Sequence, residues 1–312
     1  MYPIRFEPVY QNYVWGGDRI LRQYQRKPAP SGKIAESWEL SDRSEGMSVA
    51  ANGAYKGRTL HDLVLELGEQ LYGHGKKFDK FPLLLKIIDA KENLSIQVHP
   101  DEMTAELLKG EPKSEMWVAL DKGWVFAGLK KNTTEKELSD AIKKNRVEDH
   151  LEKIEVMPGD AVYIPGGRVH AICAGSFLYE IQQNSNTTYR LYDWGRTERP
   201  LHLKEALASI HWNDVKSPKM PHHHLESDMH HQLVSLLSSP FFVAVRVDIF
   251  DHWHGTPLHN TFQVFFCMKG DGEIIVDGSR EPFHPGMTYL VPAASQSIEI
   301  AGKCEALWIR LP

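Results

Sequence analysis

Pro158-Gly-Asp-Ala-Val-Tyr-Ile-Pro165 is the stretch that decides the architecture, because the chain contains a second copy of it. The copy, Pro285-Gly-Met-Thr-Tyr-Leu-Val-Pro292, aligns with the first without a gap. In both, Pro-Gly predicts a turn, and the apolar run predicts a buried strand that ends at the second proline. A repeated unit of this kind indicates two copies of one β-module. His170 follows the first copy after five residues, and Ser297 stands at the equivalent place after the second.

The spacing of this repeat resembles the second half of the cupin signature. That resemblance implies a mainly β protein with two jelly-roll barrels, an architecture that closes small β-domains. Helical periodicity and capping patterns occur before residue 214, so we expect the first barrel to carry helical insertions. These helices are expected at 60–71, 101–108, 132–145 and 203–210.

A polar stretch separates the two modules. Residues 213–224 combine turn-forming and polar residues without any apolar period, which is typical of a linker. We therefore predict two domains: residues 1–214 with the functional site and helical insertions, and residues 215–312 as a cupin-like β domain without metal. The interior of the second domain is expected to be filled by apolar side chains, among them Val245, Val264, Phe266 and Ile275.

The segment Leu94-Ser-Ile-Gln-Val-His-Pro100 predicts a strand with one polar face. Side chains alternate along a strand, so Ser95, Gln97 and His99 share a face. A buried polar group without a partner costs roughly 1–3 kcal/mol, so this face needs partners. Two explanations are open: a hydrogen-bonded polar core, or a pair of metal ligands two residues apart.

Further ligand candidates favour the metal explanation. His170 is expected to begin a strand that points into the first barrel, and Glu115 lies on the strand after a short helix. Together with His99 and the Gln97 amide oxygen they make a mixed nitrogen and oxygen set. Imidazole with carboxylate suits Zn²⁺, and a coordination position left for water or substrate is typical of a catalytic site.

Several longer motifs are similar to those of the type I mannose-6-phosphate isomerases in their short bacterial form. The similarity covers roughly residues 10–212 in motifs and the remainder in layout. The motifs are Leu94-Ser-Ile-Gln-Val-His-Pro100, Lys113-Ser-Glu-Met-Trp117, Pro165-Gly-Gly-Arg-Val-His-Ala-Ile172 and Glu180-Ile-Gln-Gln-Asn-Ser-Asn-Thr-Thr-Tyr-Arg-Leu-Tyr-Asp-Trp194.

This resemblance implies an enzyme that interconverts mannose 6-phosphate and fructose 6-phosphate through a cis-enediol. It also implies one zinc ion per chain as cofactor, a catalytic arginine at Arg190, and a lysine at the substrate, Lys113. The zinc ligands that it implies are Gln97, His99, Glu115 and His170.

A sugar phosphate must be attracted by local cations, because the chain as a whole has a net charge of −5. The candidate substrate-binding residues are Lys86, Lys113 and Arg190, with Ser95 as a hydroxyl donor. Lys86 interrupts an apolar strand, where a lysine more commonly extends its ammonium group to the strand end than into a pocket. Trp15, Glu36 and Trp38 are further candidates for the pocket wall, although core packing explains the tryptophans equally well.

Asn186 is the one departure from the family pattern. The motif often reads NSDTTYR, whereas this chain has Asn186 in place of the aspartate. An amide cannot take up a proton as a carboxylate does. The identity of the acid or base that opens the sugar ring therefore stays open, as does that of the proton-shuttling base.

Composition excludes several classes of protein. Apolar residues make up 42% and charged residues 25%, as in an ordinary globular protein. The acidic balance without a basic run makes nucleic acid a poor partner, and no apolar run is long enough to span a membrane. Three scattered cysteines and the lack of a signal-peptide pattern predict a reduced, cytoplasmic protein. No Gly-rich nucleotide loop is present. We expect a monomer or a weak homodimer.

The remaining histidines are weaker candidates. Residues 222–224 and 230–231 read as a solvated stretch with adventitious metal affinity. His252 and His254 form an HxH pair, with His259 nearby, but no acid follows at the cupin spacing. We therefore expect no metal in the second domain.

Two further functions stay open from the sequence. One is a non-catalytic two-barrel protein that binds a phosphosugar as a sensor or regulator. The other is an isomerase of a different sugar phosphate. A complete zinc set beside Lys113 and Arg190 favours catalysis over binding alone.

Overall fold

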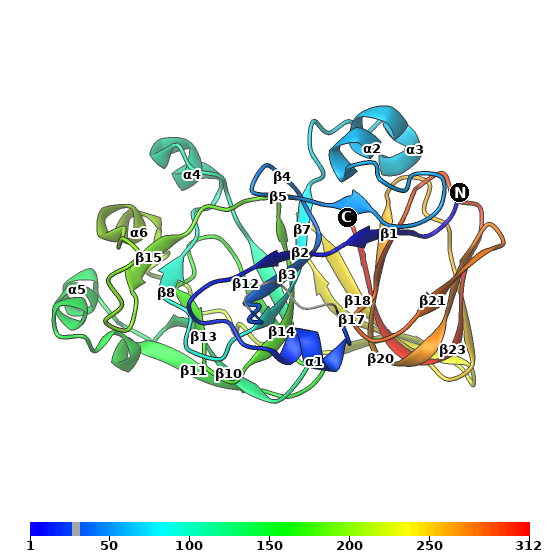
Figure 1. The fold of residues 1–312 in the computed structure, drawn as a ribbon. Coiled ribbons are helices and arrows are strands. Elements are labelled where there is room, and N and C mark those ends of the chain that lie inside the picture. Colours follow the sequence, from blue (N-terminus) through cyan, green and yellow to red (C-terminus); the bar gives the residue numbers. More distant parts are fainter. Residues whose placement is uncertain (27–31) are drawn as a thin grey trace. The chain divides into compact units, whose positions relative to one another are not determined.

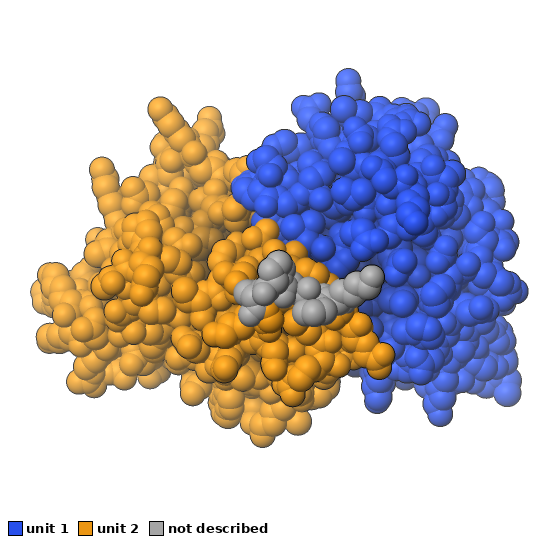
Figure 2. Space-filling model, in the orientation of Figure 1, with its two compact units in different colours: residues 1–9, 38–83, 221–312 blue, residues 10–37, 84–220 orange. Residues whose placement is uncertain are grey.

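The protein is described here by a computed structural model that covers residues 1–26 and 32–312. Strands dominate and the helices are short, which confirms the predicted mainly β class (Figure 1). The chain forms two compact units (Figure 2). Unit 1 comprises residues 1–9, 38–83 and 221–312, and unit 2 comprises residues 10–37 and 84–220. The predicted division at residue 214 thus differs from these units, since residues 1–9 and 38–83 group with the C-terminal part.

Unit 2 is built on two sheets with a shared core. One has the order β11 (Leu151–Val156), β10 (Gly123–Leu129), β13 (His170–Ile172), β8 (Ile96–Val98) and β15 (Tyr189–Tyr192). The other has the order β12 (Ala161–Ile164), β9 (Glu115–Ala119), β14 (Phe177–Gln183), β7 (Leu83–Asp89), β3 (Glu36–Leu40) and β2 (Val9–Gln11). Apolar side chains of both sheets pack in one buried cluster that includes Trp117, Val125, Ile164 and Ile172, so the apolar faces of the sheets meet.

Unit 2 also contains short helices, as the sequence predicts. Two of them begin with capping boxes: Asp101 caps α4 (Glu102–Leu108), and Thr134 caps α5 (Glu135–Lys143). The helix predicted at 203–210 is α6 (Leu203–Ser209). The sequence also indicates that residues 147–151 extend the helix at 132–145, and the structure has a separate 3-10 helix there, η1 (Val147–His150). The sequence did not predict α1 (Arg19–Gln23).

Unit 1 is organised around a ten-stranded sheet. Its order is β16 (His223–Ser227), β17 (His231–Ser238), β18 (Val243–Ile249), β23 (Ile298–Arg310), β20 (Gln263–Val276), β22 (Thr288–Val291), β1 (Ile4–Glu7) and β6 (Val49–Ala50), with β19 (His252–Gly255) on β23 and β21 (Ser279–Phe283) on β20. Gly68 divides the helix predicted at 60–71 into α2 (Leu60–Leu67) and α3 (Glu69–Tyr72). A small ribbon of β4 (Asp42–Arg43) and β5 (Gly46–Met47) completes the unit.

The two Pro-Gly copies adopt the same local structure in their separate units. Gly159 and Gly286 have φ angles of +87° and +85°, the left-handed region that glycine enters without steric cost. The strands that follow are β12 and β22, as predicted. Beyond the second copy, the Ser297 N–H donates to the Asp277 carboxylate at 2.9 Å, so Ser297 supports a neighbouring turn.

The core of unit 1 differs in one respect from the prediction. All four predicted core side chains are buried, and Val245 belongs to the buried apolar cluster that also contains Trp253 and Tyr289. From β20 the cluster takes Phe265, Cys267 and Ile274, residues next to the predicted positions. Because side chains alternate, the predicted β20 residues face the other side of the strand. Both faces of β20 are apolar, and the sequence cannot distinguish them.

Candidate active site

Strand pairing in unit 2 assembles one row of polar residues across three strands. His170 of β13 pairs with Gln97 of β8, and Gln97 pairs on its other side with Arg190 of β15. Residues directly opposite in neighbouring strands place their side chains on the same sheet face. Residues separated by up to 93 positions are thus brought side by side, and His99 follows just beyond the end of β8.

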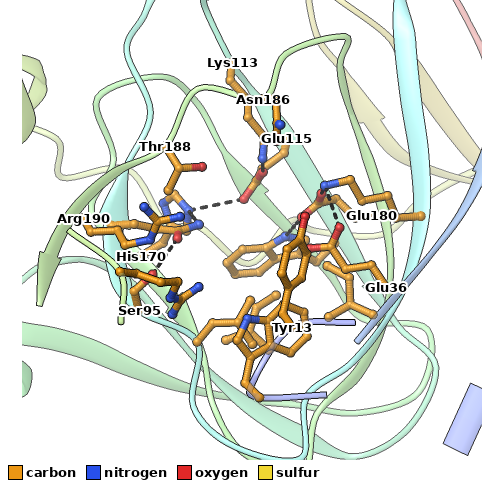
Figure 3. Close-up of a pocket in the computed structure, with 18 residues that line it drawn as sticks. Tyr13, Glu36, Ser95, Lys113, Glu115, His170, Glu180, Asn186, Thr188 and Arg190 are labelled. Atoms are coloured by element: carbon orange, nitrogen blue, oxygen red, sulfur yellow. Dashed lines mark hydrogen bonds and ion pairs between the residues drawn. The ribbon is translucent and has the colours of Figure 1, made fainter. Parts of the chain in front are cut away.

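The opposite sheet supplies the carboxylate. Glu115 begins β9, and Lys113 lies two residues before it. These residues and the polar row enclose a cavity of about 210 Å³ (Figure 3). Figure 3 shows Arg190 and Ser95 on one side of this cavity, with Glu36 and Glu180 opposite them. The lining residues are Tyr13, Trp15, Glu36, Lys86, Ile88, Leu94, Ser95, Gln97, Lys113, Glu115, Trp117, His170, Ile172, Glu180, Asn186, Thr188, Arg190 and Arg199.

Both histidines present a lone pair toward Glu115. The Nδ1 atom of His99 lies 2.9 Å from the Thr187 carbonyl oxygen, and Nδ1 of His170 lies 2.8 Å from the Arg168 carbonyl oxygen. A carbonyl only accepts, so each Nδ1 carries the proton and each Nε2 is a free acceptor. Those Nε2 atoms lie 3.3 Å and 3.4 Å from the two carboxylate oxygens of Glu115.

This arrangement places hydrogen-bond acceptors against each other in a buried position. His99, Glu115 and His170 are at most 1% exposed. Among the described residues, neither His99 Nε2 nor either Glu115 oxygen has a hydrogen-bond partner of regular geometry. Three buried acceptor groups converge here with the Lys113 ammonium beside one Glu115 oxygen, so the cluster still calls for a cation between His99, Glu115 and His170. The donor atoms of the three residues lie within 4.8 Å of one another, so the site fits a metal ion.

Gln97 completes the predicted ligand set at the edge of this cluster. Its amide nitrogen lies 3.3 Å from His170 Nε2, and its amide oxygen accepts a hydrogen bond of 3.0 Å from the Ser95 hydroxyl. The two ends of an amide are interchangeable in shape, and the chemistry around them assigns which end is oxygen. Rotating the amide by half a turn points its oxygen at the metal-binding cluster.

Electrostatics keep the cluster in the protonation state that a metal needs. Burial, together with the Lys113 ammonium, lowers the pKa of His99 to about 3, and burial also lowers the pKa of His170. Burial works against ionisation of Glu115, but Lys113 and the two histidines outweigh it and hold its pKa well below the usual value. Lys113 Nζ lies 2.7 Å from Glu115 Oε2. Neutral imidazoles and an ionised carboxylate are the forms that coordinate metals.

Lys86 is buried among carboxylates instead of extending to solvent. Its Nζ lies 3.2 Å from Glu36 and 3.3 Å from Glu180, and the lysine is 5% exposed. Burial acts to lower the pKa of Lys86, but the two carboxylates outweigh it and raise that pKa. The indole N–H of Trp117 donates to Glu180 at 2.9 Å. Lys86 therefore lines the cavity, where its charge is balanced by two wall carboxylates.

Arg190 and Arg199 bring positive charge to the cavity. Burial and the nearby Arg199 charge lower the pKa of Arg190, and its buried Nε has no partner among the described residues. Arg199 is anchored by two contacts to Asp193, at 2.7 Å and 3.0 Å. Two close guanidinium groups in one cavity form a site for an anion.

The structure brings every predicted site residue to this one place: Ser95, Lys86, Gln97, Lys113, Glu115, His170 and Arg190 line the cavity, and His99 contacts Glu115 from behind. Trp15 and Glu36 line it as expected, whereas Trp38 is buried outside the lining. Sequence reasoning missed Tyr13, Glu180, Thr188 and Arg199. Glu180 opens the quoted motif and Thr188 stands in it two residues before Arg190, so the motif could have indicated both, whereas Tyr13 and Arg199 carry no spacing signal.

Comparison with known proteins gives the family. A family model described as phosphomannose isomerase type I, catalytic domain, matches residues 4–122, and one described as mannose-6-phosphate isomerase, cupin domain, matches residues 236–311. Mannose-6-phosphate isomerase ManA of Bacillus subtilis strain 168 is 32% identical over 98% of each chain. This chain belongs to the type I phosphomannose isomerase family.

Other phosphomannose isomerases match this chain over nearly its whole length, and a solved structure of one of them has the same fold. The mannose-6-phosphate isomerase of Streptococcus mutans is 31% identical over 98% of this chain and 97% of its own. A crystal structure of the mannose 6-phosphate isomerase from Bacillus subtilis matches with a TM-score of 0.91 over 99% of each chain, at 29% identity. The cupin-domain match confirms the predicted fold class, and the family predicted from the motifs is confirmed as well.

Proposed function

We propose that this protein is a zinc-dependent isomerase that interconverts mannose 6-phosphate and fructose 6-phosphate through a cis-enediol. Family membership supports the isomerase activity. The observation that carries the proposal is the convergence of His99, Glu115 and His170 beside Lys113 and Arg190 at one cavity. A sensor would need the cations alone, and a buried metal-binding cluster next to them adds a catalytic element.

The residues that would hold zinc are His99, Glu115 and His170, with Gln97 as the fourth ligand. Two imidazoles, a carboxylate and an amide oxygen suit Zn²⁺. When bound, such an ion supplies Lewis-acid polarisation of the sugar carbonyl. The histidine tautomers in the structure support this role, because the carbonyls of Thr187 and Arg168 fix both rings with Nε2 unprotonated.

The cations of the cavity have two tasks in this proposal. Arg190, desolvated and directly opposite Gln97, stabilises the negative oxygen that develops as the enediol forms. Lys113, beside Glu115, binds the sugar phosphate and balances the carboxylate. The Ser95 hydroxyl orients the Gln97 amide and provides a polar contact on the same face.

Isomerisation also needs a group that carries a proton from C2 of the aldose to C1. The proton on C2 leaves as the C1 oxygen takes up a proton, which gives the enediol. Return of a proton to C1, with loss of the proton on the C2 oxygen, then leaves the carbonyl at C2. Asn186 lines the cavity but cannot accept a proton. Glu180 can: burial, together with the negative charge of Glu115, raises its pKa toward the range of a general base. We assign the proton shuttle to Glu180.

A coupled assay tests the proposal. Protein with a full complement of zinc is given mannose 6-phosphate, and the formation of fructose 6-phosphate is followed. We expect turnover that is lost on chelation and restored by zinc. His99→Ala should lose bound metal and activity together, because Nε2 is a ligand. Binding of the sugar phosphate without turnover would favour the sensor, and turnover of a different aldose phosphate alone would favour the other isomerase.

A further inference from the structure

A second group of metal-binding side chains lies far along the sequence from the active site, within unit 1. It consists of His230, Asp251 and His252, whose possible donor atoms all lie within 4.8 Å of one another. His230 stands in the turn between β16 and β17, Asp251 lies between β18 and β19, and His252 is the first residue of β19. The sequence suggested His254 as the partner of His252. Instead, the pairing of β17 with β18 brings His230 beside His252.

The backbone fixes the positions of these three residues. The Phe250 N–H donates to the His230 carbonyl at 2.8 Å, and the Gly302 N–H donates to the Asp251 carbonyl at 2.7 Å. The N–H of His230 donates to Asp228 Oδ1 at 2.7 Å. Each of the two turns is therefore held before any ligand binds, which lowers the entropy cost of assembling a site.

The side chains of the three residues converge on one another. Nδ1 of His230 lies 2.9 Å from both carboxylate oxygens of Asp251, and Nδ1 of His252 lies 3.2 Å from Oδ1. The imidazole centroids of His230 and His252 are 4.2 Å apart. A carboxylate only accepts, so His230 donates its Nδ1 proton to Asp251, and a divalent cation that binds here displaces that proton and takes a lone pair from each ring.

Access distinguishes this cluster from the active site. The side chains of His230 and His252 are 35% and 38% exposed, so an ion reaches them from solvent without passing through the active-site cavity. Two imidazoles and a carboxylate oxygen leave positions for water, and such sets prefer Zn²⁺, Ni²⁺ and Cu²⁺ over Mg²⁺ and Ca²⁺. His254, on the same face of β19, lies with its ring 5.3 Å from that of His252 as a possible additional ligand.

We propose that His230, Asp251 and His252 form a second, solvent-accessible site for a divalent transition metal ion, which clamps the β16–β17 turn to the β18–β19 turn. This site revises the expectation of a metal-free C-terminal part, because the third donor came only from strand pairing. Ion binding at these turns stabilises the folded state, in which alone the three donors meet.

Metal stoichiometry tests the site directly. Protein whose active site is filled with one equivalent of Zn²⁺ is titrated with further Zn²⁺ by calorimetry, and the bound metal is counted after dialysis against a low concentration of Zn²⁺. We expect a second equivalent and a higher unfolding temperature with excess Zn²⁺. His252→Ala and His230→Ala should each weaken the second binding by roughly tenfold or more, because each removes one ligand. Both should retain the first equivalent and the isomerase activity.

His284→Ala is the matched control. His284 also forms an exposed histidine–aspartate pair, with Asp271 at 2.9 Å, and it belongs to no described cluster of three ligands. We expect this variant to bind the second equivalent as the unaltered chain does. Either of two results would overturn the site: a single equivalent in the unaltered protein, or second binding that persists in both His230→Ala and His252→Ala. Persistent binding would place the ion elsewhere, for example at His222–His224.

Discussion

At the scale of single residues, the site depends on the two hydrogen bonds that set the histidine tautomers. A carbonyl accepts the Nδ1 proton of His99 and another accepts that of His170, so both Nε2 atoms face Glu115 as acceptors. The ligand types could be predicted from sequence, because strand alternation and motif spacing identify them. The tautomers could not, since Thr187 and Arg168 have no sequence feature that marks their carbonyls as partners.

Arg190 provides the sharpest residue-scale prediction. Arg190→Ala should lower kcat by roughly 10²–10³-fold with a smaller change in KM, because the lost contact is made to charge that develops during reaction. Steady-state kinetics on zinc-loaded protein measure this, with metal content determined in parallel and expected to be normal. Arg22→Ala, an exposed arginine paired with Asp18, is the control and should behave like the unaltered enzyme. A kcat/KM close to that of the unaltered enzyme in Arg190→Ala would remove Arg190 from the catalytic residues.

Lys86 tests whether a buried ammonium balances charge or binds phosphate. Lys86→Met leaves the carboxylates of Glu36 and Glu180 without their buried counter-charge, which should cost about 3–5 kcal/mol of stability. Lys86→Met/Glu36→Gln should recover part of that loss, as measured by thermal unfolding. We expect the double variant to keep a KM for mannose 6-phosphate near that of the unaltered enzyme. A KM at least roughly tenfold higher would instead support the substrate-binding role predicted from sequence.

At the scale of elements, the turn between β12 and β13 is held from outside by an ion pair. Arg168, in that turn, donates to both oxygens of Asp214 at 2.5 Å and 2.8 Å. It also donates to the Tyr163 carbonyl at 2.7 Å. Arg168 is 3% exposed. The turn leads directly into His170, so this ion pair fixes the start of the strand that carries a ligand.

Asp214 makes the stability of this turn depend on pH. Burial acts to raise the pKa of Asp214, but the hydrogen bonds and charge of Arg168 outweigh it and lower that pKa. A lowered pKa stabilises the fold fully above the unfolded value near 3.9, and the contribution is lost as pH falls toward the folded value. Asp214→Asn should cost about 2 kcal/mol at pH 7, and less below about pH 4, in chemical denaturation.

The control for this prediction is Asp140→Asn. Asp140 pairs with Lys136 and Lys143, but its side chain is 41% exposed and solvent screens both pairs, so we expect Asp140→Asn to unfold like the unaltered chain. An equal loss in both variants, or a loss in Asp214→Asn that does not shrink in acid, would contradict the role of the pair.

Local sequence patterns predicted where helices and strands occur, but they did not predict which strands pair with each other. Capping boxes located α4 and α5, and the Pro-Gly repeat located β12 and β22. The pairing of β1 with β22 had no signal, because a strand's sequence fixes its apolar face and leaves its neighbour undetermined. The cluster of His230 with His252 was missed for the same reason.

At the scale of the whole molecule, each compact unit is made of separated chain segments. In unit 1, β22 pairs with β1, and β1 pairs on its other side with β6. A division at residue 214 would separate β1 and β6 from β22 and leave open strand edges on both pieces. The predicted domains 1–214 and 215–312 are therefore a hypothesis that fragments can test. Among the described residues, no helix is long and apolar enough to cross a membrane.

We expect neither fragment to fold by itself. Fragments 1–214 and 215–312, produced separately, should show no cooperative calorimetric transition and little amide protection, whereas the full chain shows both. Mixing the fragments should recover some structure if the missing pairings drive assembly. A sharp transition in fragment 215–312 alone would support the linear division and would show that β1 and β6 are dispensable.

The interleaving of the two units has a consequence for synthesis on the ribosome. All segments of unit 2 have been translated once residue 220 has emerged, whereas unit 1 still lacks residues 221–312 at that point. The sheet of unit 1 is still incomplete when residue 220 emerges, because Ile4 on β1 pairs with Leu290 on β22, which has not yet been translated. Contacts between such distant residues form slowly. The nascent chain thus carries β1 with the edge that later pairs with β22 still open through most of translation, a state that chaperones would need to shield from aggregation.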